Sequence, residues 1–233
     1  MDDLEEIQCI LWHEFGHFLI DLHLIEVHTE ISINEILIRN YECENVNWCG
    51  WVDLIPKANL KYEEVIKDLS LTAFKFISLP SGCLFQSKNA PDKIDFNVCF
   101  AFKRKAIGKG DYDKFWELEF QLRKNNEVDD NDKKAFFESL NTIVFEKYIN
   151  EVEKLNEFQK GLKIIIDRES TIILADYINK KTPENYSFRF EGEYLDNLSA
   201  ELTALMSKYN FSDVIKNIHS AITNLISKHI IKK

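Results

Sequence analysis

The chain has 233 residues, of which 45% are hydrophobic, and a formal net charge of −10 at pH 7. This length and apolar content suffice for a substantial hydrophobic core, while the acidic balance argues against nucleic acids and anionic membranes as partners. The acidic N-terminus is unlike a secretory signal, and no apolar run approaches the ~18 residues that span a bilayer. We therefore expect a cytoplasmic protein without a membrane segment.

Hydrophobic periodicity divides the first half of the chain into helices and two strands. Pro80 and Gly82 are expected to end the second helix, and Asp111 is placed as the N-cap of the fourth. The expected elements, in chain order, are helix 3–23, strand 30–38, strand 48–55, helix 61–79, helix 92–105 and helix 111–124.

The second half reads as mostly helical. A long amphipathic helix is predicted over 131–167, continuing towards residue 180, and a loop or short hairpin over 183–194. Helices over 195–208 and 212–231 close the chain. The fold class is therefore mainly α with a small β element (α+β), and we divide it into a core at 1–126 and a helical C-terminal region at 127–233 that packs on the core.

The first predicted helix carries the sequence LWHEFGHFLIDLHL, in which His13, Glu14 and His17 form an HExxH motif. Residues four apart share one face of a helix, so two imidazoles can bind one Zn²⁺ while the adjacent glutamate reaches a metal-bound water. Chance matches to so short a motif occur. The apolar surroundings favour a metal site here, because polar side chains on a buried helix need a partner.

The third ligand is not fixed by this motif, and several residues compete for the role. His23 has the spacing of the last histidine in HExxHxxGxxH, but Ile20 replaces the glycine that would break the helix. Glu64, on the next helix, has the residue type that thermolysin-like zincins use. Asp111, in the sequence GKGDYD, begins a helix after two glycines, and Asp113 is its fallback.

Four segments resemble the peptidase domain of the FtsH-type zinc proteases. They are HEFGHF at 13–18, CGWVDLIP at 49–56, LPSGCL at 79–84 and the GKGDYD helix start at 108–113. The resemblance implies a zincin-like FtsH-type fold, with zinc on His13, His17 and Asp111 and with Glu14 as general base. It also implies that the strand near 48–54 pairs with an extended substrate.

The chain departs from that family in several respects. It has no P-loop, so the resemblance implies a stand-alone peptidase without the ATPase module. Pro80 and Gln86 stand near positions where the family has helix and an acidic residue, which alters the surroundings of the site.

The leading functional interpretation is a zinc-dependent metallopeptidase that hydrolyses peptide or protein substrates. The alternatives are a regulatory zincin that cleaves one protein partner and an inactive binding module that zinc stabilises. The sequence leaves the oligomeric state open. The five cysteines are odd in number and lack CxxC spacing, which argues against a disulfide framework and predicts that most of them are buried thiols: Cys9, Cys43, Cys49, Cys83 and Cys99.

Overall fold

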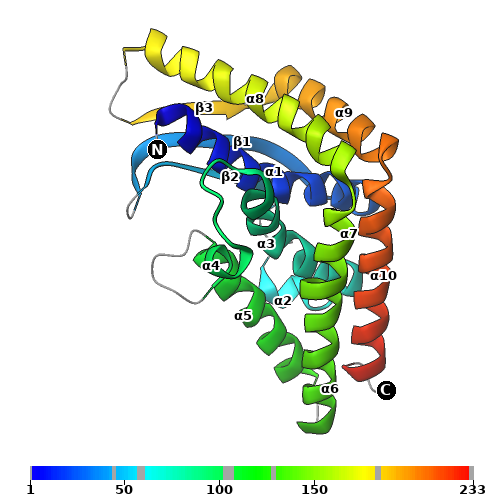
Figure 1. The fold of residues 1–233 in the computed structure, drawn as a ribbon. Coiled ribbons are helices and arrows are strands. Elements are labelled where there is room, and N and C mark those ends of the chain that lie inside the picture. The colour runs from blue at the N-terminus through cyan, green and yellow to red at the C-terminus, as the bar shows by residue number, and fades with distance from the viewer. Residues whose placement is uncertain are drawn as a thin grey trace.

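The computed structural model describes residues 2–43, 46–56, 61–101, 108–126, 130–181 and 185–230 (Figure 1). It is mainly helical with one three-stranded antiparallel sheet, which confirms the mainly α fold class with a small β element. Within these ranges, no helix combines the length and the apolarity needed to cross a membrane.

The strands are β1 (Ser32–Cys43), β2 (Val46–Ile55) and β3 (Tyr186–Phe190). The helices of the first half are α1 (Asp3–Val27), α2 (Tyr62–Val65), α3 (Leu69–Asn89), α4 (Phe96–Cys99) and α5 (Lys109–Asn125). Those of the second half are α6 (Asp130–Asn141), the π-helix η2 (Thr142–Tyr148), α7 (Ile149–Glu153), α8 (Asn156–Asn179), α9 (Gly192–Lys208) and α10 (Phe211–His229).

Helix α1 begins with a capping box. The Asp2 carboxylate accepts a hydrogen bond from the Glu5 backbone N–H at 2.9 Å, and the Glu5 side chain reaches back to the Asp2 backbone N–H. From Leu11 to Leu24 nearly every side chain is buried. This part of α1 is buried on all sides, and the helix is accordingly packed against α3, α8, α9 and the sheet.

The strand order in the sheet is β2-β1-β3. Ile38 of the central strand β1 pairs with Gly50 of β2 on one side and with Phe188 of β3 on the other. Strand β3 falls within the loop or short hairpin predicted over 183–194, of which residues 183 and 184 lie outside the described ranges. Its partner is a strand far away in the sequence, so local turn signals could not reveal it.

The prediction that Pro80 and Gly82 end the second helix is wrong. Helix α3 continues to Asn89, and its turns from Phe76 to Gln86 are buried. Pro80 supplies no backbone N–H to the Phe76 carbonyl, and the Ser81 hydroxyl donates separately to the Ile77 carbonyl at 2.6 Å. Burial of the whole segment outweighs the local preference of proline for a helix end.

Other boundaries also differ from the sequence prediction. The helix expected over 92–105 is reduced to the single turn of α4, although residues 102–105 lie outside the described ranges. The long helix expected over 131–180 is divided into α6, η2, α7 and α8. The Gln159 side chain donates to the Val152 carbonyl at 2.8 Å and so satisfies the backbone at the break between α7 and α8.

The C-terminal region packs on the core region. Helix α8 contacts α1, and α10 contacts α3 and runs beside α6 and η2 (Figure 1). Buried side chains of both regions belong to one hydrophobic cluster, in which Phe85 of α3 meets Phe158 and Phe211. Helix α1, which carries the HExxH motif, is therefore held from several sides.

Candidate metal centre

Three side chains from two distant helices meet at one point. His13 and His17 lie one turn apart on α1, and their Nε2 atoms are 3.2 Å from each other. Asp111 lies in the first turn of α5, and its Oδ2 atom is 3.2 Å from each of these nitrogens. The N-cap residue of α5 is Gly108, so the prediction of Asp111 as N-cap is wrong.

The other ring nitrogen of each histidine has its own partner. His17 Nδ1 lies 2.8 Å from the Ser78 carbonyl oxygen, which can only accept, so this nitrogen carries the proton. His13 Nδ1 lies 3.2 Å from Oε1 of the Gln86 amide. In the neutral rings, both Nε2 atoms therefore direct a lone pair towards the Asp111 carboxylate. Such partners on the outer ring nitrogen are typical of histidines that bind metals.

The donor set fits a zinc ion. Tetrahedral zinc with ligands at about 2.0–2.2 Å separates its ligand atoms by about 3.3–3.6 Å. The three separations of 3.2 Å between His13 Nε2, His17 Nε2 and Asp111 Oδ2 are close to this value. Three lone-pair donors at such distances repel one another unless a cation or a proton lies between them.

The electrostatics of the cluster favour positive charge. Burial alone would lower the pKa of His17, but the neighbouring Asp111 and Glu14 carboxylates raise it to about 9. Burial alone would raise the pKa of Asp111, but His17 and His13 hold it well below its usual value. Without a metal, the cluster therefore takes up a proton, and a metal ion has to displace it.

Glu14 lies beside the cluster on the same helix and is 6% exposed. Burial raises the pKa of its carboxyl group, and the neighbouring His13 and His17 oppose this rise. A Cβ atom at Gly50 would come within 2.8 Å of Glu14 Cγ, so β2 passes directly over this side chain. No hydrogen-bond partner of the Glu14 carboxylate occurs in the described part of the chain, which leaves it available to a substrate or a water molecule.

Two glycines bring α1 and α3 into close contact at the site. A Cβ atom at Gly16 would lie 2.5 Å from the Ser81 carbonyl oxygen. A Cβ atom at Gly82 would lie 2.5 Å from His17 Nε2 and 2.8 Å from His13 Nε2. Any side chain at Gly82 would therefore crowd the two nitrogen atoms that converge on Asp111.

The competing candidates for the third ligand lie elsewhere. His23 Nδ1 pairs with Glu26 at 3.0 Å, and its ring packs against Phe74. Glu64 of α2 forms an ion pair with Lys67. Asp113 pairs with Lys109 on α5. Among the candidates from the sequence, Asp111 is the one that the structure places at both histidines.

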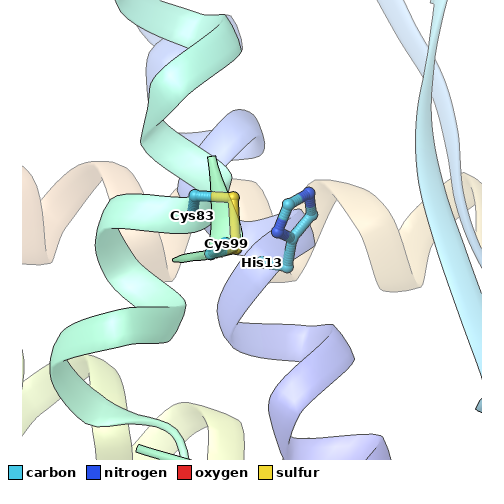
Figure 2. Close-up of side chains that lie close together, drawn as sticks. All are labelled: His13, Cys83 and Cys99. Carbon is cyan, nitrogen blue, oxygen red and sulfur yellow. A yellow bond between two sulfur atoms is a disulfide. The ribbon is translucent and has the colours of Figure 1, made fainter. Parts of the chain in front are cut away.

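A disulfide between Cys83 and Cys99 lies next to His13 (Figure 2). The prediction of buried thiols without disulfides is therefore wrong for this pair, which joins α3 to α4 across a sequence separation of 16. Both sulfur atoms lie within 4.8 Å of a ring nitrogen of His13. Because they are bonded to each other, they cannot act as thiolate ligands, whereas His13, His17 and Asp111 keep their donor atoms.

Sequence reasoning missed the residues that orient the histidines. Ser78 acts through its backbone carbonyl, which no side-chain pattern reveals. Gln86 was noticed only as a departure from the family pattern, and its partner Asp92 was not noticed at all. The polar side chain of Gln86 itself was the one signal that the sequence offered.

Comparison of the chain with protein-family models, curated proteins and solved structures finds no match.

Proposed function

We propose that the protein is a zinc-dependent peptidase with a zincin-like, FtsH-type site. The observation that carries the proposal is the meeting of His13 Nε2, His17 Nε2 and Asp111 Oδ2 at 3.2 Å from one another. Glu14 lies in the adjacent position that an HExxH peptidase requires of its general base. These three ligands leave the fourth position of a tetrahedral ion for water or substrate, as catalytic zinc sites do.

Zinc, when bound, lowers the pKa of a coordinated water towards 7 and polarises a carbonyl oxygen. Glu14 accepts the proton of the attacking water and later delivers it to the leaving amine nitrogen. Its burial suits this role, because a carboxylate whose pKa is raised towards the working pH holds a proton and releases it again. Gln86 and the Ser78 carbonyl keep the imidazole rings oriented.

The position of β2 supports an extended peptide as substrate. In the described part of the chain β2 pairs with β1 alone, so it forms an edge of the sheet. Gly50 of this strand packs against Glu14. A peptide that adds to this edge as a further strand would bring its backbone past the general base, and backbone pairing requires no particular sequence. Flexible or unfolded segments are therefore the proposed substrate class.

Hydrolysis of an unstructured, fluorescence-quenched casein substrate by the purified zinc-loaded protein tests this function. Glu14→Gln should remove turnover and keep zinc, because an amide cannot accept the proton. Glu26→Gln is the matched control, since Glu26 lies further along the same helix and pairs with His23 instead. It should keep full activity.

Two other functions make different predictions in the same assay. A zinc-stabilised binding module would hold the metal and show no turnover in the wild type or in either variant. A regulatory zincin would spare casein and cleave one protein, with the same dependence on Glu14. Turnover that survives Glu14→Gln would contradict the proposed mechanism.

A further inference from the structure

A buried amide and a carboxylate form a chain of contacts behind His13. Gln86 is completely buried in α3, and its Oε1 atom lies 3.2 Å from His13 Nδ1. Its Nε2 atom donates to Asp92 Oδ2 at 2.8 Å. Each polar end of this buried side chain therefore has a partner, as burial of an amide demands.

Asp92 decides which way the amide of Gln86 faces. A carboxylate oxygen accepts and does not donate, so the NH₂ group of Gln86 has to point towards Asp92. The carbonyl oxygen of Gln86 then points towards His13 and accepts from Nδ1–H. The second oxygen of Asp92 accepts from the Ile94 backbone N–H at 3.4 Å, which holds the carboxylate in the turn after α3.

Asp92 also lies against α1. Burial raises the pKa of the Cys9 thiol to about 12, and the Asp92 carboxylate beside it contributes to this rise. Cys9 stands one turn before His13 on the same face of α1. Asp92 contacts Cys9 and Gln86 contacts His13, so both lie along this face. Cys99 Sγ also contacts the amide, at 3.6 Å from Gln86 Oε1.

We infer that Gln86 and Asp92 are positioning residues that fix the tautomer of His13, an inference that rests on the proposed metal site. They hold the proton on Nδ1 and so leave the Nε2 lone pair facing His17 and Asp111. In many metal sites, a carboxylate accepts directly from the outer ring nitrogen of the histidine and fixes its tautomer. Here the Gln86 amide, oriented by Asp92, has that role. Without Gln86, His13 would lose its acceptor at Nδ1, and the proton would move to Nε2, where Asp111 accepts it.

Long-range ¹H–¹⁵N NMR of the metal-free full-length protein shows directly which nitrogen of His13 carries the proton. The wild type should show Nδ1–H, and Gln86→Leu should show Nε2–H. Gln86→Glu should restore Nδ1–H, because its carboxylate is again an acceptor. Gln159→Leu is the matched control, since Gln159 is partly buried and donates to the Val152 backbone carbonyl instead of contacting a histidine. An unchanged tautomer in Gln86→Leu would overturn the inference.

Zinc affinity, measured by competition with a chromophoric chelator, is the second readout. Gln86→Leu should weaken zinc binding about 10–100-fold, and Asp92→Ala should also weaken it. Gln86→Glu should recover affinity, which a purely structural role would not predict. Equal zinc affinity of the wild type and Gln86→Leu would contradict the inference. The tautomer readout needs neither zinc nor turnover, so an inactive protein with the expected tautomers would refute only the proposed function.

Discussion

Asp111 Oδ2 lies 3.2 Å from His13 Nε2, although 98 positions of the sequence separate the two residues. Helix α3 makes this contact possible, because it packs against α1 on one side and α5 on the other. The first turn of α5 then presents its carboxylate to the histidines, at a helix end that favours negative charge.

Asp111→Asn should weaken zinc binding by at least ~100-fold, because even residues that merely orient a ligand contribute about 10–100-fold. Asp113→Asn is the matched control on the same helix, since Asp113 pairs with Lys109. Equilibrium dialysis with zinc measures both. Glu64→Ala and His23→Ala should bind zinc like the wild type, and a loss in either variant with retention in Asp111→Asn would refute the assignment of Asp111.

Gly82→Ala should disrupt the site without unfolding the protein. The new methyl group would lie 2.5 Å from His17 Nε2, so the ring or α3 has to move. Gly110→Ala provides the control, because a Cβ atom there meets no other atom within 4 Å. It should bind zinc normally and gain up to ~1 kcal/mol of stability, since alanine favours a helix. Normal zinc binding by Gly82→Ala would show that the glycine is dispensable.

Reduction of the Cys83–Cys99 disulfide should lower the free energy of unfolding by ~3 kcal/mol, the amount expected for a closed loop of about 15 residues. The two cysteines are separated by 16 positions in the sequence. The disulfide also lies against the start of α5, because a Cβ atom at Gly108 would approach Cys83 Sγ. Urea unfolding with and without a phosphine reductant measures the effect. The double variant Cys83→Ser, Cys99→Ser should not respond to the reductant, and an insensitive wild type would contradict the prediction.

Stability should decrease as the pH falls below about 6.5, partly through His219. Burial lowers the pKa of His219. The hydrogen bond with the Ser70 carbonyl opposes this decrease, while the neighbouring His23 and His28 add to it. As the pH falls, His219 therefore binds a proton more readily in the unfolded chain than in the folded chain. This contribution to stability is complete above the unfolded pKa and is lost as the pH falls through the folded pKa.

His219→Gln tests this origin of the pH dependence. Glutamine can still donate to the Ser70 carbonyl, which lies 3.1 Å from His219 Nε2, but it does not titrate. The slope of unfolding free energy against pH between about 5 and 6.5 should become smaller in this variant. An identical slope in both proteins would assign the effect to other groups.

The elements that local patterns define were predicted well from the sequence. The HExxH helix and the first two strands lie where hydrophobic periodicity put them, with ends that shift by a few residues. The path of α3 through Pro80 was not predictable, because burial on all sides overrides the local preference. β3 was missed for a related reason, since its partner β1 lies far away in the sequence.

The candidate site shows the same division. Their spacing on one helix identified His13, Glu14 and His17 as candidate site residues. Asp111 was one of several candidates for the third ligand and was preferred through a family resemblance. The structure places Asp111 at both histidines, but zinc binding stays a prediction. Contacts through a backbone carbonyl, as at Ser78, or through a chain of polar side chains, as at Gln86 and Asp92, leave no pattern in a single sequence.

X-ray absorption at the zinc edge of the zinc-loaded full-length protein tests the central claim most directly. His13, His17 and Asp111 predict a shell of nitrogen and oxygen atoms at about 2.0–2.2 Å, with the multiple scattering of two imidazole rings and about one zinc per chain. Sulfur at about 2.3 Å would instead place the ion on reduced Cys83 and Cys99 beside His13 and would contradict the account. A protein that takes up no zinc would contradict it as well.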